Sequence, residues 1–419
     1  MTSNAEANSL KGRDPTVRNV VLLAGALALS NSGASLTMTV TALAGAMLAL
    51  GKGMLELPGF SVPYAALATL ALTVQFFGTM SATIPASLLM GRIGRRAGFT
   101  IGQCFGITGG LLGAYALFQN DFWLFVLAGY VIGIHNAFWG FYRFAAADTA
   151  SPAFKPKAIS FVMAGPVFAA ILGPEIAKRT ADLFEPILFA GAYASISVLS
   201  VLAMIVLQFI QIPTPPRRKK GESGRPLAVI MRQPKFIVAV MSAMIGYAVM
   251  SLVMTATPLA IIACGYEFSD SAFVIQWHVL GMFLPSFVTG ILIARFGALS
   301  VIKVGALLNL TCVAVAMSGV ELANFWFALV LLGVGWNFMF VGGTSLLTET
   351  YRPEEKEKVQ AINDFCVFVL VALSSLGAGA VHFALGWNAV TLTTVVPVLL
   401  AFIAALWLRL AERGRTRAS

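Results

Sequence analysis

The sequence predicts an all-α membrane protein in which twelve transmembrane helices form two pseudo-symmetric bundles of six. Three observations support this fold class. Hydrophobic residues make up 58% of the chain and charged residues 11%, whereas about 25% of the residues in an ordinary soluble domain are charged. Apolar runs long enough to cross a bilayer recur along the whole chain. A motif in the first half returns about 200 residues later in the second.

The repeated motif begins with a glycine in an apolar run, continues with an asparagine among aromatic residues, and ends in an acid-x3-Pro-x4-Lys pattern. In the first half it consists of Gly133, Asn136, Asp148, Pro152 and Lys157. In the second half it consists of Gly333, Asn337, Glu349, Pro353 and Lys358. A period of about 200 residues is far too long for a solenoid repeat. It therefore indicates two homologous halves, as in transporters with parallel repeats.

Six apolar runs in the first half are each long enough to cross a hydrocarbon core of about 30 Å at 1.5 Å per helical residue. We expect spans at residues 20–47, 62–90, 98–118, 122–148, 158–179 and 184–212. The first run is much longer than the apolar segment of a signal peptide, so we expect it to be a spanning helix.

Residues 213–234 divide the halves, because they are rich in proline and charge and are not expected to pack a core. Six further spans are expected at residues 235–264, 268–294, 297–319, 323–348, 359–384 and 387–408. The predicted organisation is an N-terminal tail, a first bundle, a basic linker, a second bundle and a C-terminal tail, at residues 1–16, 17–212, 213–234, 235–411 and 412–419.

Most of the 28 Lys and Arg residues fall in the tails, the linker and alternate connections on one side. Such an excess marks the cytoplasmic side, so we expect a multi-pass inner-membrane protein with both termini in the cytoplasm. The net charge of +10 then reflects topology and attraction to anionic lipid, and a nucleic-acid partner is not expected.

The residue patterns of enzymes and metal sites are not found in the sequence. The four cysteines, Cys104, Cys264, Cys312 and Cys366, lie in or at the ends of apolar runs without metal-ligand spacing. The sequence also lacks a nucleotide-binding loop and a nucleophile elbow. We expect a protein that is not an enzyme, has no cofactor or bound metal, and is monomeric.

Two loops carry a family pattern. Ser87–Arg96 lies between spans two and three, and Gly290–Gly297 lies between spans eight and nine. Both resemble the Gly-x-Leu-x-Asp-Arg-x-Gly-Arg-Arg signature of the major facilitator superfamily, although Gly91 and Ala294 replace its Asp. With the twelve spans and the long basic linker, the resemblance covers the whole chain. It implies a secondary transporter in which two six-helix halves rock about a midplane site.

The resemblance also implies a charged gate on the cytoplasmic side, with candidate residues Arg92, Arg143, Asp148, Arg295, Glu349 and Asp364. We expect Arg92 to pair with Asp148, because a cation at the bilayer edge needs a carboxylate partner. By the same argument Arg295 pairs with Glu349. The alternative is that these charges simply extend to water. Arg143 is expected to pair with an aspartate of the gate, the alternative being contact with the substrate.

The resemblance further implies that spans 1, 4, 7 and 10 face a central cavity. Candidate substrate contacts, chosen as polar or aromatic residues near the middle of spans, are Asn31, Gln75, Asn136, Tyr247, His278, Trp336 and Asn337. For the two repeated asparagines the alternative is an interhelical hydrogen bond. For His278 the alternatives are transfer of a coupling proton and a packing role. Carboxylates and basic residues are expected away from the midplane, which disfavours cationic drugs and strong anions.

Amide and aromatic groups suit a neutral, planar solute that stacks on aromatic faces and forms hydrogen bonds at its edges. We expect uptake of such a solute, with riboflavin the first candidate, because the superfamily includes riboflavin importers and the chain looks like a bacterial member. One alternative is proton-coupled efflux of amphipathic drugs or metabolites, which the partial Gly-Pro pattern at residues 165–174 favours. The other is a membrane assembly or sensor protein without transport, which the missing signature Asp allows.

Overall fold

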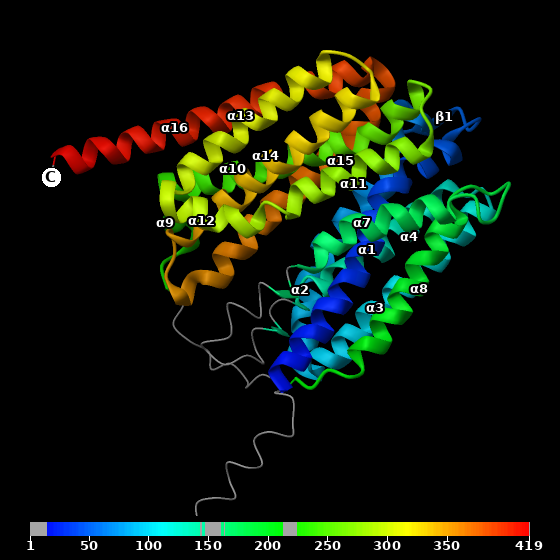
Figure 1. Cartoon of the computed structure of the whole chain (residues 1–419), viewed down its shortest axis with the longest axis horizontal. Coiled ribbons are helices and arrows are strands. Elements are labelled where there is room, and N and C mark those ends of the chain that lie inside the picture. Colours follow the sequence, from blue (N-terminus) through cyan, green and yellow to red (C-terminus); the bar gives the residue numbers. More distant parts are fainter. Residues whose placement is uncertain (1–14, 143–144, 147–160, 163, 213–223, 419) are drawn as a thin grey trace, which may run out of the picture.

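The computed structural model describes residues 15–142, 145–146, 161–162, 164–212 and 224–418. Within these residues the chain forms two bundles of long helices (Figure 1). Long helices are favoured because the bilayer core offers no water to backbone N–H and C=O groups, which therefore bond within each helix. The predicted helical fold of two bundles is confirmed.

The first bundle contains helices that correspond to the first six predicted spans. They are α1 (Pro15–Ala49), α2 (Leu70–Ile93), α3 (Arg95–Phe118), α4 (Phe122–Trp139), α7 (Gly165–Thr180) and α8 (Ala190–Leu207). In this bundle α1 packs on α7 and α8, while α4 packs on α2 and α3. Asp121 caps α4, because its carboxylate accepts hydrogen bonds from the backbone N–H groups of Trp123 and Leu124 at 2.9 and 3.0 Å.

The connection between α1 and α2 differs from the prediction. It contains an antiparallel hairpin of β1 (Met54–Leu57) and β2 (Phe60–Pro63), followed by the 3₁₀ helix η1 (Tyr64–Leu67). The predicted span started at residue 62, because the strands are themselves apolar and merge with the apolar run. Gly59 has a φ of +92° at the turn of the hairpin, a conformation that favours glycine.

The second bundle contains the remaining elements. They are α9 (Leu227–Met231), α10 (Pro234–Ala263), α11 (Phe268–Phe283), α12 (Ser286–Phe296), α13 (Ala298–Met317), α14 (Leu322–Thr348), η2 (Pro353–Glu355), α15 (Lys356–Leu392) and α16 (Val395–Ala418). The predicted span 268–294 is divided into α11 and α12, because Pro285 has no N–H to continue the helical ladder. The end of the predicted linker is ordered as α9, whose Ile230 is fully buried.

Ten helices within the described ranges are long and apolar enough to cross a membrane. One of them, Lys358–Arg413, has 56 residues and contains Gly386 with a φ of +77°, where the chain turns from one helix into the next. This break lies between the two last predicted spans. With this division and with the 16-residue α7, the described helices account for the twelve predicted spans.

The repeated glycines of the two halves have the same structural role. A Cβ atom at Gly133 of α4 would lie 2.1 Å from the carbonyl oxygen of Gln75 on α2. A Cβ atom at Gly333 of α14 would lie 2.5 Å from the carbonyl oxygen of His278 on α11. Both distances are too short for a real side chain, so both glycines allow two helix backbones to approach closely. This shared packing supports the homology of the halves.

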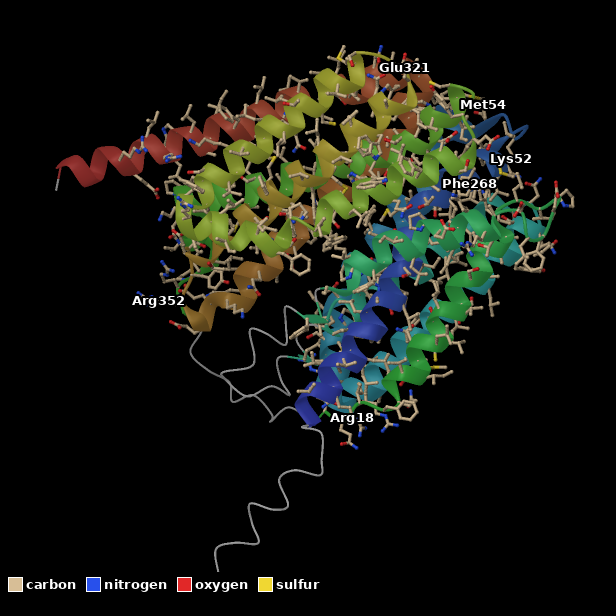
Figure 2. All side chains as sticks on the ribbon, viewed as in Figure 1. Arg18, Lys52, Met54, Phe268, Glu321 and Arg352 are labelled. Atoms are coloured by element: carbon tan, nitrogen blue, oxygen red, sulfur yellow. The ribbon has the colours of Figure 1, made fainter. Side chains whose placement is uncertain are left out.

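The two bundles meet on one side of the molecule and diverge on the other (Figure 1). We call these the hairpin side, where β1 and β2 lie, and the linker side, where residues 212 and 224 flank the linker. Figure 2 shows Lys52, Met54 and Phe268 near one another on the hairpin side, whereas Arg18 and Arg352 lie far apart on the linker side.

Contacts between the bundles are concentrated on the hairpin side. There α15 packs on α2 and η1, and α11 packs on α7. The ring of Phe189 contacts the ring of Phe268 with centroids 5.1 Å apart. The hydroxyl of Thr69 donates a buried hydrogen bond of 2.7 Å to the carbonyl oxygen of Ser375. These contacts close the hairpin side of the junction.

Candidate functional site

Five aromatic rings of the second bundle gather at the junction between the bundles. This central aromatic cluster consists of Tyr247 on α10, Phe283 on α11, Trp336 and Phe340 on α14, and Phe368 on α15. Trp336 stacks on Phe340 with centroids 5.2 Å apart and an interplanar angle of 9°. Tyr247 presents its edge to both rings at 5.4 Å. Stacked and edge-to-face contacts are the geometries that aromatic rings prefer.

The first bundle also contributes to this region. Phe76 of α2 is buried against Ala243, Val367 and Val371, and Met38 of α1 packs on the same group. Tyr247 and Phe340 pack there too, so the central aromatic cluster bridges the two bundles. A solute that binds between halves must contact both of them, which makes this position suitable for a site that opens alternately to each side.

Two polar groups of the central aromatic cluster have unused hydrogen-bonding capacity. The indole N–H of Trp336 is buried and has no hydrogen-bond partner among the described residues. An unpaired buried donor costs about 1–3 kcal/mol, which an acceptor on a bound solute would recover. The hydroxyl of Tyr247 also makes no hydrogen bond within the described part of the chain. The structure therefore brings two of the predicted substrate contacts together.

Asn337 was predicted to contact the substrate, but its amide group is bonded to other residues of the chain. Its amide nitrogen donates to the carbonyl oxygen of Met282 at 2.7 Å and to the hydroxyl of Ser286 at 2.6 Å. Its amide oxygen lies 2.7 Å from the hydroxyl of Thr289. The side chain is fully buried and spans the break between α11 and α12. The interhelical alternative is therefore the one formed, and Asn337 gives the Met282 carbonyl a donor at the break between α11 and α12.

Asn136, the counterpart of Asn337 in the first half, makes a local contact instead. Its amide oxygen accepts a hydrogen bond of 3.0 Å from the indole N–H of Trp139, one turn along α4. Asn136 is half-buried, so its amide nitrogen remains a predicted substrate contact. Asn31 of α1 is 9% exposed and makes no side-chain hydrogen bond with another described residue. Its role as a substrate contact also stays a prediction.

Gln75 and His278 are enclosed by neighbouring helices. The amide of Gln75 donates to the hydroxyl of Thr37 at 3.3 Å, and the residue is 1% exposed. The Nδ1 atom of His278 lies 2.7 Å from the carbonyl oxygen of Leu329, which identifies Nδ1–H as the donor. His278 is fully buried, and its Nε2 atom has no partner within the described residues. Both side chains lie between packed helices, and their roles as substrate contacts, or for His278 in transfer of a coupling proton, stay predictions.

The predicted pair of Arg295 with Glu349 is not formed. Glu349 instead pairs with Lys235, at 2.9 Å, and Lys235 also pairs with Glu412, at 3.1 Å. The guanidinium group of Arg295 is exposed and lies 5.3 Å from the centre of the Phe296 ring. The prediction was wrong because it considered only the signature arginine, whereas the first turn of α10 brings a lysine beside the end of α14.

The other gate residues are only partly described. Arg143 and Asp148 lie outside the described residues, so their expected pairs stay predictions. Arg92 is exposed and makes no ion pair with a residue that the structure describes. Asp364 lies on α15, where its carboxylate accepts a hydrogen bond of 3.1 Å from Asn363.

Sequence reasoning missed several members of the junction. Phe283, Phe368, Phe76 and Met38 were not selected, because three of them lie on spans that were not expected to face the cavity and Met38 carries no polar group. The only available signal was the abundance of Phe in the sequence, with 31 residues, and abundance does not indicate which of them converge.

Comparison with known proteins extends this picture. The model of the Major Facilitator Superfamily matches residues 20–316 and 243–419. The chain is 36% identical over 399 residues to "Riboflavin transporter RfnT" of Brucella anthropi, covering 95% of this chain and 97% of that protein. It is 29% identical over 364 residues to "Uncharacterized MFS-type transporter YdeG" of Bacillus subtilis, covering 83% and 81% of the two chains.

Solved structures have the same fold. A bacterial homologue of the human lysosomal transporter Spinster, described as inward-facing and unoccupied, superimposes with a TM-score of 0.69 at 14% identity, covering 94% of this chain and 98% of that one. The human organic anion transporter MFSD10 superimposes with a TM-score of 0.66 at 14% identity, covering 94% and 100%. At such identity the likeness concerns the fold alone. Family model, relatives and fold agree, and this multi-pass membrane protein belongs to the Major Facilitator Superfamily.

Proposed function

We propose that this protein takes up riboflavin, or a closely similar neutral planar heterocycle, across the inner membrane. The observation that carries this proposal is the 36% identity to a protein named riboflavin transporter over nearly the whole of both chains. The chemistry of the central aromatic cluster agrees with it. A flat ring system with a polar edge would use aromatic faces for stacking and buried N–H or O–H groups for hydrogen bonds.

The distribution of charge also supports a neutral solute. Helix α14, which carries Trp336 and Phe340, contains no charged residue. Helix α10, which carries Tyr247, has Lys235 in its first turn as its one charged residue. A charged solute held between these helices would lack a counter-ion from them, which is very costly in a low-dielectric site.

Alternating access is the mechanism that this arrangement supports. The basic linker is expected in the cytoplasm, so closure of the hairpin side corresponds to a state that is open inward. To open outward, the bundles must separate at the Phe189–Phe268 and Thr69–Ser375 contacts and approach each other on the linker side. Binding of the solute between Tyr247 and the first bundle would favour the exchange when it contacts both halves.

The remaining features of the proposal concern topology and surroundings. Both termini and the linker lie in the cytoplasm, where their basic residues attract anionic lipid headgroups. The protein acts as a monomer, since one chain contains both halves of the transport pathway. It moves its solute without chemical conversion, as expected for a member of a transporter family.

Uptake of limiting labelled riboflavin by an auxotrophic bacterium without its own importer tests this function. We expect saturable uptake that depends on expression of the protein. Trp336→Phe keeps an aromatic ring but removes the N–H, so KM should rise about 2- to 10-fold, the effect of losing one hydrogen bond. Trp326→Phe is the matched control, because Trp326 lies on the same helix but packs on Trp277.

The outcomes separate the substrate from the site. If protein is present in the membrane but uptake does not exceed the background, riboflavin import is excluded, and faster loss from preloaded cells would favour efflux. If uptake occurs with the same KM in Trp336→Phe, Trp326→Phe and the parent, the substrate stands and Trp336 is not its hydrogen-bond donor.

A further inference from the structure

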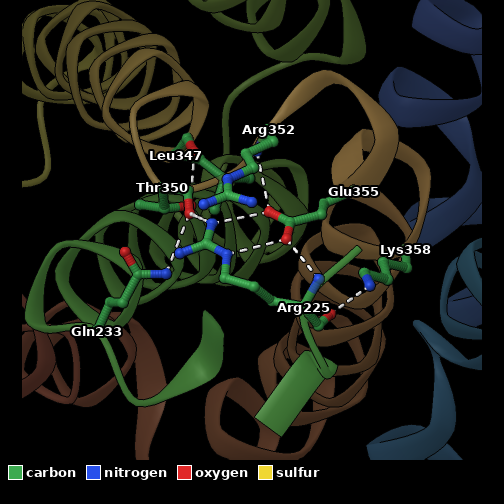
Figure 3. Close-up of polar contacts among 7 residues, drawn as sticks. All are labelled: Arg225, Gln233, Leu347, Thr350, Arg352, Glu355 and Lys358. Carbon is green, nitrogen blue, oxygen red and sulfur yellow. Dashed lines mark hydrogen bonds and ion pairs between the residues drawn. The ribbon is translucent and has the colours of Figure 1, made fainter. Parts of the chain in front are cut away.

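An ion pair between a partly exposed arginine and a buried carboxylate holds the end of the linker against the second bundle (Figure 3). The guanidinium group of Arg225 donates two hydrogen bonds to the carboxylate of Glu355, at 2.9 and 2.7 Å. The backbone N–H groups of Arg225 and Arg352 donate to the same carboxylate, at 2.7 and 2.9 Å. The side chain of Glu355 is fully buried. We call this arrangement the linker clamp, formed by Arg225 and Glu355.

The linker clamp is a strong form of ion pairing. Two parallel hydrogen bonds between guanidinium and carboxylate fix the angle as well as the distance between the two residues. Together with the backbone N–H donors, the Arg225 guanidinium holds the pKa of Glu355 well below its usual range. Glu355 therefore stays ionised, and removal of Arg225 would leave a buried charge without its main partner.

Further contacts connect the linker clamp to neighbouring elements. Arg225 also donates to the carbonyl oxygen of Thr350 at 3.0 Å, and Gln233 donates to the same oxygen at 3.0 Å. Lys358, which ends the repeated sequence motif, donates to the carbonyl oxygen of Arg225. Gly224 has a φ of +57°, and a Cβ atom there would lie 2.5 Å from Glu355, so the close approach requires glycine.

Together these contacts tie the linker-side ends of three helices. Gln233 immediately precedes α10, Thr350 follows α14, and Glu355 immediately precedes α15. The pair of Lys235 with Glu349 joins α10 to α14 a second time. Helix α15 takes no part in that second pair, and its first residue, Lys356, directly follows Glu355 of the linker clamp. The clamp is thus a defined attachment of the start of α15 to the rest of its bundle.

The opposite part of α15 makes the main contact with the first bundle. Ser375 accepts the hydrogen bond from Thr69, and a Cβ atom at Gly379 would lie 2.7 Å from the Thr69 hydroxyl. Helix α15 therefore extends from the linker clamp on one side to the closed contact on the other. A rigid helix that is fixed at one end transmits a rotation of its bundle to the other end.

We propose that the linker clamp makes α15 move as one body with the second bundle, so that the contact at Thr69 opens only when the bundles rock. Arg225 is thus a positioning residue that acts through Glu355. This inference deepens the alternating-access mechanism proposed above, but it does not depend on which solute is carried. Without the clamp, the start of α15 keeps its apolar packing in the second bundle, where Val359 is fully buried, but loses its polar attachment. The far contact then separates more often while the bundles stay as they are.

Labelling of a cysteine at Ser375 measures the far contact directly, because Ser375 accepts the bond from Thr69 through its backbone carbonyl and Ser375→Cys keeps it. Ser375 is fully buried, so Ser375→Cys, in a chain whose four native cysteines are replaced, reacts with a membrane-impermeant maleimide only when the hairpin side opens. Cells without added riboflavin are used, so that the result is independent of the substrate. We expect Arg225→Ala to raise the labelling rate about fivefold or more, the lower end of coupling between distant sites.

Arg232→Ala is the matched control, because Arg232 is another arginine close to the linker but takes no part in the clamp. It should label at the parental rate. A second comparison places Arg225→Ala in a Glu355→Gln background. If Arg225 acts through Glu355, Arg225→Ala raises the labelling rate little further in the Glu355→Gln background, since the ion pair is already lost there.

The result that overturns the proposal is a parental labelling rate in Arg225→Ala protein whose amount and melting temperature match those of the parent. The proposal is also overturned if Arg225→Ala raises the labelling rate equally in the parental and in the Glu355→Gln background, because Arg225 would then act independently of Glu355. If Arg225→Ala does not reach the membrane, Arg225→Lys replaces it, since lysine keeps the charge but loses the two-pronged geometry. A parental rate in that variant contradicts the proposal, and an intermediate rise supports it.

Discussion

At the scale of single residues, the two repeated asparagines have diverged in role. Asn337 joins three groups across the break between α11 and α12, whereas Asn136 bonds to Trp139 on its own helix. Two residues at the same position of the repeat therefore contribute differently to packing, since Asn337 connects helices and Asn136 does not. This difference follows from Pro285, which leaves backbone groups of the second half without helical partners.

The divergence predicts unequal effects of substitution. Asn337→Ala leaves the Met282 carbonyl without its side-chain donor and should lower stability by about 1–3 kcal/mol. Asn136→Ala removes one local contact and should lower it by less than about 1 kcal/mol. Denaturation of the purified variants in detergent measures both. An equal loss in the two variants would contradict the bridging role of Asn337.

The sequence indicated which residue types lie at mid-membrane depth, but not which way they point. Helices that are apolar on all sides have weak amphipathicity, so their pattern does not separate a cavity face from a packing face. Tyr247 and Trp336 were selected as aromatic residues near the middle of spans, and the structure brings their ring centroids to 5.4 Å. The partners of Asn337 were not predictable, because they are exposed by a break whose geometry depends on the neighbouring helix.

At the scale of elements, the close approach of α15 to η1 and to Thr69, just before α2, depends on one glycine of a nearby pair. A Cβ atom at Gly379 would lie 2.7 Å from the Thr69 hydroxyl and 3.1 Å from the carbonyl oxygen of Ala66. A Cβ atom at Gly377, half a turn away, would meet only Leu252 at an ordinary 3.7 Å. The two positions thus provide a test with an internal control.

We expect Gly379→Ala to impair closure of the hairpin side and to reduce the maximal uptake rate several-fold. Gly377→Ala should leave uptake within about twofold of the parent, because its added methyl group makes only an ordinary van der Waals contact with Leu252. Uptake assays at equal membrane abundance provide the measurement. Equal rates in the two variants would show that this approach of the helices does not limit transport.

Element boundaries were predictable where the bilayer determines them. Span lengths follow from the thickness of the hydrocarbon core, which is why most predicted spans end within a few residues of the observed helices. The hairpin was missed because its strands are apolar like the neighbouring helix. Pro285 was visible in the sequence, but proline is tolerated in membrane helices and does not by itself predict a complete break.

At the scale of the whole molecule, the repeat and the basic linker correctly indicated two bundles. The specific contacts between bundles were not predictable, because α2 meets α15 and α7 meets α11 through small and apolar residues without a sequence signature. The linker clamp was missed for a similar reason. Arg225 and Glu355 are 130 residues apart in the chain, and only the folded second bundle brings them together.

Rocking of whole bundles predicts that a covalent link on the hairpin side stops transport. Phe189→Cys with Phe268→Cys, in a cysteine-free chain, places two thiols where ring centroids lie 5.1 Å apart between bundles. Oxidation or a short cross-linker should abolish uptake, and reduction of the disulfide should restore it.

The control pair lies within the first bundle. Phe118→Cys with Phe184→Cys replaces two rings whose centroids are 5.6 Å apart, and a link there joins parts that move together. It should leave uptake close to the parental value. Full activity of the linked Phe189 and Phe268 pair would refute rigid-body rocking about this junction.

The β1–β2 hairpin is attached to the first bundle at more than one point. Lys52 donates to the carbonyl oxygen of Asn120 at 3.2 Å, and Tyr64 contacts Phe122 with ring centroids 5.3 Å apart. Its turn, at Gly59 and Phe60, is exposed. The hairpin is thus exposed and firmly attached to the first bundle. An antibody fragment raised against it would act as a fiducial for electron microscopy and leave the second bundle free to move.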